Sequence, residues 1–164
     1  MGETVREGGC ACGEVRYRFT GEPIMVHNCH CRLCQRQTGS TSVVNVFTES
    51  ENVELLSGEL TRHAVPGGSG NLHTIFRCKT CGTAMWSQYP RLGSLMTGFR
   101  AGTLDDAGSV TPDVAIFTDF RMPWMTLPEG IPAFGEYYDF REVLSPESQQ
   151  RLMALGERRK AGEG

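Results

Sequence analysis

The stretch Asn28-Cys29-His30-Cys31-Arg32-Leu33-Cys34-Gln35-Arg36-Gln37-Thr38-Gly39-Ser40 places three cysteines within six positions. Packing gives no reason to crowd three small apolar side chains so closely, whereas three thiolates near one point suit a soft or borderline cation such as zinc. A structural zinc takes four protein ligands, and this stretch offers three. The fourth ligand therefore either comes from elsewhere in the chain or is a water or substrate at an open position.

The composition of the 164-residue chain is that of a globular protein, with 39% hydrophobic and 21% charged residues. Twenty glycines and eight prolines favour a turn-rich fold dominated by strands over a helical bundle. We expect a single domain that spans residues 1–164, with a motif-bearing core at about residues 8–134.

Charge and hydropathy exclude several classes of partner. The formal net charge of −3 and the absence of a basic stripe argue against nucleic acid. The N-terminal residues have no apolar signal-peptide core, and no apolar run approaches the ~18 residues that span a bilayer. We therefore expect a cytoplasmic protein without a membrane partner. Thiols stay reduced in that compartment, so seven cysteines in close groups indicate metal ligands before disulfides.

The spacing of apolar residues predicts strands separated by glycine-rich turns. The strands are expected at residues 15–19, 24–28, 42–47, 53–56, 60–65, 72–76, 84–89, 95–99 and 113–117. The fifth and sixth form a hairpin closed by the turn at residues 66–71. A short helix is expected at residues 32–38, closed by Gly39, and a tight turn at residues 8–13.

The C-terminal third contains irregular chain and one helix. Three prolines interrupt residues 120–134, which we expect to pack as an irregular lid across the sheet. Ser145-Pro146-Glu147 supplies a cap residue, a proline in the first helical position and a first-turn acid. This pattern predicts a helix at about residues 145–155, stopped by Gly156 and followed by a frayed tail at residues 157–164.

The seven cysteines fall into three groups: Cys10 with Cys12, Cys29 with Cys31 and Cys34, and Cys78 with Cys81. Two pairs that are distant in sequence predict one closed four-thiolate zinc site. The triplet is then left for a second metal with an open fourth position. Two alternatives remain: the triplet takes its fourth ligand from one of the pairs and leaves spare thiols, or the cysteines form redox disulfides.

The four histidines are weaker candidates. His30 lies between two ligands, so in an extended segment it points away from the metal, and it could serve as an outer-sphere group or a proton carrier. His27 could substitute as a ligand because it alternates with Cys29 on a strand. His63 and His73 are expected to be ordinary sheet residues.

Three arginines lie beside the cysteine groups: Arg32, Arg36 and Arg77. A zinc ion with three thiolates carries a net charge of −1, so a nearby guanidinium would be favourable and could also bind a substrate carboxylate. A solvated arginine with neither role is the simpler interpretation for each of the three.

The motifs resemble those of a known family. Gly9-Cys10-Ala11-Cys12-Gly13, Cys29-His30-Cys31-Arg32-Leu33-Cys34-Gln35-Arg36-Gln37-Thr38-Gly39-Ser40 and Phe76-Arg77-Cys78-Lys79-Thr80-Cys81-Gly82-Thr83 resemble hallmark blocks of the glutathione-dependent formaldehyde-activating enzyme family, which includes centromere protein V. Its C-terminal block is similar to Ala115-Ile116-Phe117 followed by Pro123-Trp124 and Gly130-Ile131-Pro132-Ala133-Phe134.

The resemblance implies a mainly β, tent-like fold of antiparallel sheets built around a structural zinc, here with a short C-terminal helix. It implies two zinc ions per chain, a structural one on Cys10, Cys12, Cys78 and Cys81 and a catalytic one on Cys29, Cys31 and Cys34. The implied activity is that of a carbon–sulfur lyase, which condenses glutathione or another small thiol with formaldehyde or a related aldehyde to give S-hydroxymethylglutathione. The alternative is a non-catalytic zinc-binding interaction module of the same fold.

Overall fold

The computed structural model describes residues 4–67 and 70–164 and consists mainly of strands. The strands are β1 (Val5–Gly9), β2 (Arg16–Thr20), β3 (Met25–Cys29), β4 (Val43–Glu49), β5 (Val53–Ser57), β6 (Leu60–Pro66), β7 (Leu72–Cys78), β8 (Ala84–Gln88), β9 (Met96–Arg100) and β10 (Val114–Ile116). The helices are α1 (Arg32–Thr38), α2 (Phe140–Val143) and α3 (Pro146–Lys160), and 3₁₀ turns lie at Ser50–Asn52, Gly93–Leu95, Ala101–Thr103, Ala107–Ser109 and Thr118–Phe120.

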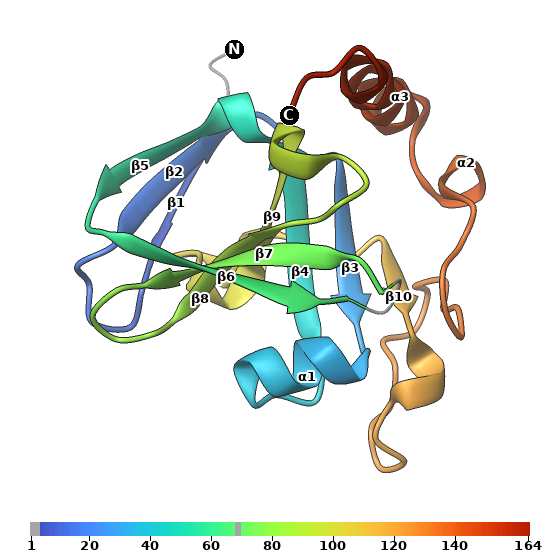
Figure 1. Cartoon of the computed structure of the whole chain (residues 1–164). Helices are drawn as coiled ribbons and strands as arrows, with labels where there is room; N and C mark the ends of the chain where they lie inside the picture. The colour runs from blue at the N-terminus through green and yellow to red at the C-terminus, as the bar shows by residue number, and fades with distance from the viewer. Residues whose placement is uncertain (1–3, 68–69) are drawn as a thin grey trace.

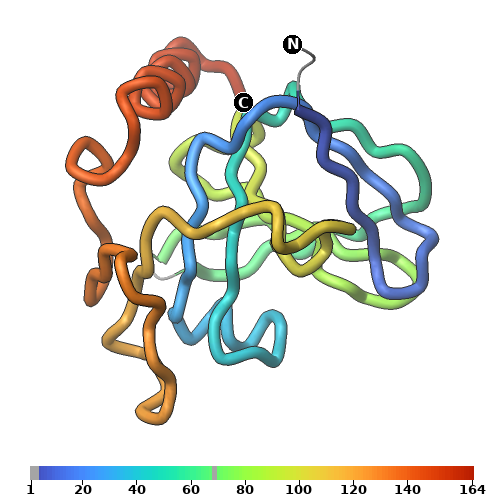
Figure 2. Tube along the Cα trace, turned by 180° about the vertical axis from the view of Figure 1, so that it is seen from behind, coloured from blue at the N-terminus to red at the C-terminus, as the bar shows by residue number. Residues whose placement is uncertain are grey.

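The strands form two sheets that lean together like the sides of a tent (Figure 1). The smaller sheet has the order β1-β2-β5, and the larger sheet has the order β10-β3-β4-β9-β8-β7-β6. Neighbouring strands are antiparallel, except β10 and β3, which are parallel. Figure 2 shows the smaller sheet on the opposite side of the molecule from the C-terminal segment. The expected mainly β, tent-like architecture is confirmed, with one parallel pair at the edge of the larger sheet.

An aromatic core fills the space between the two sheets. Tyr17 and Phe19 project from β2 and stack on Phe99 of β9, with ring centroids 4.6 and 5.3 Å apart. Trp86 of β8 meets Phe99 edge-on, at a centroid distance of 5.4 Å. Tyr17, Phe19 and Phe99 are completely buried. Large buried aromatic side chains contribute strongly to stability, so this cluster holds the small sheet against the large one.

The face of the larger sheet that points away from this core is apolar at one end. Met25 and Phe47 are directly opposite each other on β3 and β4, and they belong to the same buried apolar cluster as Leu152 and Leu155 of α3. Helix α3 therefore covers the region at the start of β3. The other end of β3, where Cys29 lies, leads into α1 (Figure 1).

The predicted strands are observed with ends shifted by one or two residues, and the short helix at residues 32–38 is α1. The predicted hairpin pairs β6 with β7 from Leu60 opposite Cys78 to Pro66 opposite Leu72. Residues 68 and 69 of its turn lie outside the described residues. Strand β1 was not predicted, because Val5-Arg6-Glu7-Gly8-Gly9 has one large apolar side chain and no periodicity. Its conformation is set by pairing with β2.

The predicted end of the C-terminal helix is wrong, because α3 continues through Gly156 to Lys160 and includes the first four residues of the expected frayed tail. A glycine within a helix costs only about 1 kcal/mol, which other interactions can offset. Cations in the last turn favour a helix C-terminus. Arg158 also pairs with Glu51 and Glu163, at 3.0 and 2.8 Å.

The expectation of a lid across the sheet is also wrong. The segment after β10 runs along the edge of the larger sheet, where the amide of Ala115 donates to the carbonyl of Pro132 and the amide of Phe134 donates to the carbonyl of Ala115, each at 2.9 Å. Trp124, expected to pack on the sheet, is 73% exposed. The backbone pairing at this edge decides the course of the segment, and a single sequence contains no signal for it.

Replacement of Arg151 by methionine tests the docking of α3. Its guanidinium donates two hydrogen bonds to Glu49, at 2.8 and 2.6 Å, and both side chains are partly buried. In Arg151→Met the carboxylate loses its cation, and we expect urea denaturation to show a loss of about 1–3 kcal/mol at pH 7. The control Arg158→Met removes a pair with exposed partners on the same helix and should cost less than about 1 kcal/mol.

The same pair predicts a pH dependence. Burial raises the pKa of Glu49, but the hydrogen bonds and charge of Arg151, together with hydrogen bonds from the backbone and from Thr48, lower it by more in sum, so the net shift is below the ordinary value of 4.5. A carboxyl group with a lowered pKa contributes stability above its ordinary pKa and loses that contribution as the pH falls through the folded value. The stability advantage of the wild-type protein over Arg151→Met should therefore shrink below pH 4.5. A constant difference between pH 7 and about pH 3 would contradict this.

Candidate functional site

Two separate groups of cysteine sulfurs converge in the structure. One contains Cys10, Cys12, Cys78 and Cys81, and the other contains Cys29, Cys31 and Cys34. Within each group all Sγ atoms lie within 4.8 Å of one another, and all seven cysteines are free thiols. In the described ranges, the structure therefore brings together the same two groups that the spacing predicts, and no member of a pair joins the triplet.

The four-cysteine group joins the two sheets. Cys10 and Cys12 lie in the turn after β1, while Cys78 ends β7 and Cys81 lies in the turn before β8. The Sγ atoms of Cys10 and Cys12 are 3.4 Å apart, and those of Cys12 and Cys78 are 3.8 Å apart. Tetrahedral zinc with Zn–S bonds of about 2.3 Å requires sulfurs roughly 3.8 Å apart, so this group fits a zinc ion.

The two turns of this group have the same construction. Gly13 and Gly82 have φ values of +83° and +74°, and their amides donate to the carbonyls of Cys10 and Cys78, at 3.1 and 2.9 Å. Only glycine adopts this left-handed conformation without strain. The amide of Cys81 points at the Sγ of Cys78, at 3.5 Å. Such amide contacts stabilise a thiolate, which a metal ligand must become.

The three-cysteine group is built where a strand becomes a helix. Cys29 ends β3, Cys31 caps the N-terminus of α1, and Cys34 lies in the first turn of α1. The Sγ of Cys31 accepts a hydrogen bond from the amide of Cys34, at 3.3 Å. Cys29 and Cys34 are buried, whereas Cys31 is half-buried. The group is therefore closest to solvent at Cys31.

The triplet has the electrostatics of a cation site. Hydrogen bonds from the thiols of Cys29 and Cys34 lower the pKa of Cys31, because they favour its thiolate. The contacts with Cys31 and Cys34, together with burial, raise the pKa of Cys29 well above its ordinary value. One thiolate therefore forms easily and a second does not, unless a cation compensates the charge. The donor set of three sulfurs fits a borderline cation such as zinc.

Helix α1 is held in place by two buried or bridging side chains. The amide nitrogen of Gln35 donates to the carbonyls of His30 and Phe120, at 2.8 and 3.0 Å. Arg77 of β7 donates to the carbonyls of Gly82 and Gln37, at 2.9 and 3.2 Å, and to the side chain of Gln37. Arg77 thus connects the turn of the four-cysteine group to the end of the helix that carries Cys34.

The arginines named from the sequence are not buried beside the triplet. Arg77 has the bridging role described above. Arg32 is exposed and donates to the side chain of Gln35, and Arg36 is exposed. Water screens exposed charges strongly, so these groups compensate the charge of the triplet weakly.

A buried arginine that sequence reasoning missed lies on the same sheet face as the triplet. Arg100, the last residue of β9, donates to the Oδ1 of Asn45 and, at 2.6 Å, to the Oγ of Ser87. His73 and Tyr89 stack nearby, with ring centroids 4.9 Å apart. The positive charge of Arg100 acts on both rings, and it also favours the thiolate of Cys34. In the sequence, Arg100 directly follows the uncharged predicted strand at residues 95–99, and all five positions of β9 prove to be buried. A charged residue at the end of such a strand was the available signal.

The histidines beside the triplet are not ligands in this arrangement. The Nε2 of His27 hydrogen-bonds the hydroxyl of Tyr138, at 2.6 Å, and burial lowers the pKa of His27 to about 4. His30 is completely buried, and within the described residues neither ring nitrogen has a hydrogen-bond partner. Burial lowers the pKa of His30 as well, with a contribution from the charge of Arg121, so its imidazole is neutral. His73, expected to be an ordinary sheet residue, belongs to the polar group around Arg100.

Aromatic side chains from the segment after β10 pack against the apolar cluster that contains Cys29 and Cys34. Phe117 follows β10 directly and has a φ of +55°, a strained value for a bulky residue. Its ring packs edge-on against Tyr137, at 4.8 Å, and lies 6.5 Å from that of Phe120. Burial and the charges of Cys29 and Cys31 raise the pKa of Tyr137, so its phenol is protonated at neutral pH. Strain of this kind persists at functional sites, where the surroundings hold the residue in place.

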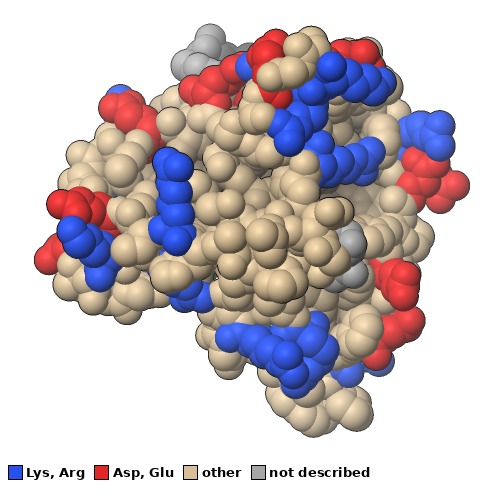
Figure 3. Space-filling model, in the orientation of Figure 1, with Lys and Arg blue, Asp and Glu red and all other residues tan. Residues whose placement is uncertain are grey.

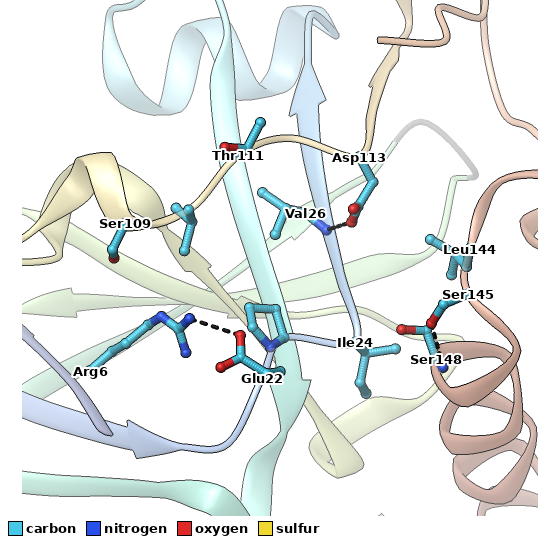
Figure 4. Close-up of a pocket in the computed structure, with 12 residues that line it drawn as sticks. Arg6, Glu22, Ile24, Val26, Ser109, Thr111, Asp113, Leu144, Ser145 and Ser148 are labelled. Atoms are coloured by element: carbon cyan, nitrogen blue, oxygen red, sulfur yellow. Dashed lines mark hydrogen bonds and ion pairs between the residues drawn. The ribbon is translucent and has the colours of Figure 1, made fainter. Parts of the chain in front are cut away.

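A cavity of about 240 Å³ lies elsewhere (Figure 4). It is lined by Arg6, Glu22, Asp113 and the N-terminal end of α3, and no cysteine borders it. Arg6 already pairs with Glu22, and Asp113 accepts from the amide of Val26, both visible in Figure 4. Each of its three charged side chains therefore already has a hydrogen-bond partner, and none of the sulfurs that could hold a metal faces it.

The surface has no dominant charge on the face seen in Figure 3. Among the residues described, Lys and Arg form separate small groups there, most of them next to Asp or Glu, and no basic stripe crosses that face. Within residues 4–67 and 70–164, no helix has the length and apolar character needed to cross a membrane.

Comparisons with known proteins identify relatives. The family model described as glutathione-dependent formaldehyde-activating enzyme matches residues 5–120, which include both cysteine groups. A curated protein of Halomonas elongata, provisionally named as such an enzyme, is 23% identical over 125 residues, which are 74% of this chain and 80% of that protein. A solved structure of a Rhodobacter sphaeroides protein matches with a TM-score of 0.47 and 20% identity, covering 78% of this chain and 98% of that one.

Metal counting distinguishes the roles of the two groups. We expect the purified protein to bind about two zinc ions per chain, by elemental analysis. Cys31→Ser should retain about one zinc and unfold cooperatively near the wild-type temperature, because the triplet lies at the end of one strand. Cys78→Ser should lose the zinc that joins the two sheets and several kcal/mol of stability. If Cys31→Ser instead lost both metals and its fold, the triplet would belong to the site on which folding depends.

Proposed function

The chain belongs to the glutathione-dependent formaldehyde-activating enzyme family, and from this premise we propose that it is a zinc-dependent carbon–sulfur lyase. It condenses glutathione, or another small thiol, with formaldehyde or a related aldehyde and gives S-hydroxymethylglutathione or its analogue. In this proposal Cys10, Cys12, Cys78 and Cys81 hold a structural zinc, and Cys29, Cys31 and Cys34 hold a catalytic one. Seven free cysteines are consistent with action in the reducing cytoplasm.

The observation that carries the proposal is the number of sulfurs at the end of β3. Three Sγ atoms converge there, and within the described residues no fourth His, Cys, Asp or Glu joins them. A closed structural zinc site uses four protein ligands, whereas a catalytic site keeps one position open. The half-buried Cys31 lies on the side from which a small substrate can approach.

The residues of the site prepare it for an ionised sulfur. Zinc held by the three cysteines would lower the pKa of a thiol at the fourth position. In the reaction the sulfur would add to the carbonyl carbon, the π electrons of the C=O bond would move to oxygen, and the proton released by the thiol would go to that oxygen. Hydrogen bonds of Gln35 and Arg77 hold the two ends of α1, the helix that carries Cys34.

A non-catalytic interaction module is the second candidate. The observation that favours it is an exposed aromatic surface on the segment after β10, where Trp124 is 73% and Tyr137 69% exposed. Exposed aromatic side chains are typical of protein interfaces. The two candidates differ in one measurable property, the rate at which thiol and aldehyde equilibrate.

Exchange spectroscopy by NMR measures that rate directly. We expect the two-zinc protein to accelerate the equilibration of formaldehyde, glutathione and S-hydroxymethylglutathione over the uncatalysed reaction. Cys31→Ser should reduce the acceleration at least about 100-fold, since it removes a ligand of the open site. The control Arg18→Met alters an exposed ion pair on β2 and should leave the rate unchanged.

The interaction module would be favoured if zinc-loaded protein accelerated the equilibration of no thiol–aldehyde pair in a series of such pairs. Equal rates for the wild-type protein and Cys31→Ser would also remove the triplet from the mechanism. Both results require that metal content be measured on the same samples.

A further inference from the structure

Arg100 is the one buried charged residue in the described part of the chain. Its side chain is 5% exposed, and its hydrogen bonds go to neutral groups, the Oδ1 of Asn45 and the Oγ of Ser87. Its Nε is buried without a partner in the described residues. No carboxylate there lies within ion-pair distance of it. Burying an uncompensated charge is strongly unfavourable, so this guanidinium requires a nearby anion.

The register of the larger sheet indicates where that anion is. Arg100 lies directly opposite Asn45 on β4, and Asn45 lies directly opposite His27 on β3. Residues that face each other across strands share a sheet face, as do residues two apart along a strand. Arg100, Asn45, His27 and Cys29 are therefore on one face. Cys29 belongs to the three-cysteine group, so that group lies at the end of the face that carries Arg100.

The charge of the cysteine group matches this requirement. Three thiolates around a divalent cation carry a net charge of −1, and a thiolate as fourth ligand makes it −2. Without a counter-charge, the second negative charge would favour a neutral fourth ligand over an anionic one. Arg32 and Arg36 are exposed and screened by water, whereas Arg100 acts through the protein interior, where screening is weak.

We propose that Arg100 is the fixed counter-ion of the three-cysteine centre and makes its fourth position selective for an anionic thiolate over a neutral ligand. This inference rests on the proposed function, because it concerns the same open site. Arginine suits the role because its charge is permanent at any physiological pH. The residue acts through the charge of the centre and touches neither substrate, so it is a positioning residue.

Ligand titrations of cobalt-loaded protein test the proposal without any aldehyde. Cobalt(II) reports an added thiolate by an increase in the sulfur-to-metal charge-transfer band, above the band that the seven cysteines already give. The probes are 2-mercaptoethanol, which binds as an anion, and imidazole, which binds neutral. Removal of a nearby opposite charge changes the pKa of an ionisable group by about one unit or more. Arg100→Met should therefore lower the affinity for 2-mercaptoethanol at least about tenfold at fixed pH, while the affinity for imidazole changes less than about threefold.

Three further variants separate charge from shape. Arg100→Lys keeps the charge and should retain thiolate affinity within about threefold of wild type. Ser87→Ala removes a neutral partner of Arg100 and should behave in the same way. Asn45→Asp places a carboxylate against the guanidinium and so neutralises the charge of Arg100 while the side chain stays in place. This variant should lower the affinity for 2-mercaptoethanol as Arg100→Met does. This last variant keeps the proposal testable if Arg100→Met does not fold.

The proposal is overturned if Arg100→Met or Asn45→Asp binds 2-mercaptoethanol like the wild type. It is also overturned if both ligands weaken equally, since that indicates distortion of the site. A protein that shows the selectivity but does not accelerate the thiol–aldehyde reaction would refute the proposed function and leave the role of Arg100 intact. If Arg100→Met still accelerated the reaction and had unchanged thiolate affinity, the role of Arg100 would be refuted and the proposed function would stand.

Discussion

The convergence of four cysteines from two hairpins is the constraint on which the rest of the structure depends. Cys10 and Cys12 belong to the small sheet, whereas Cys78 and Cys81 belong to the large one, so the group joins the sheets where their turns meet. Two of these turns' cysteines, Cys12 and Cys81, are exposed, which means that apolar burial alone does not hold the turns together. Coordination by one metal would replace that missing burial, as it does in small zinc-stabilised folds.

The four-cysteine group also helps to position the three-cysteine group. Arg77 lies at the four-cysteine turn and bonds the end of α1, while Gln35 anchors the start of that helix. The aromatic core around Phe99 fixes β9, and β9 in turn presents Arg100 on the opposite face of the sheet. A single strand thus contributes to stability on one side and to the electrostatics of the site on the other. This division follows from the alternation of side chains along a strand.

The cysteine grouping could be predicted because metal ligands within each motif are separated by one or two residues, so local spacing reports local geometry. Strand positions could be predicted because burial imposes a period on the apolar residues. The end of α3 was missed because the ion pairs of Arg158 involve Glu51, which is distant in sequence. The course of the segment around Trp124 was missed because backbone pairing with β10 leaves no mark on its composition.

The sequence by itself determined the family, the mainly β class and the two sets of sulfurs, since each of these is recorded in short, contiguous motifs. Only the tertiary structure decided which arginine side chain lies on the buried face beside the three-cysteine group. Arg32 and Arg36 are its neighbours along the chain but face water, whereas Arg100 is 66 positions beyond Cys34 and shares the buried face. Strand register brings such residues together, and register depends on pairings across the whole sheet, which no local pattern encodes.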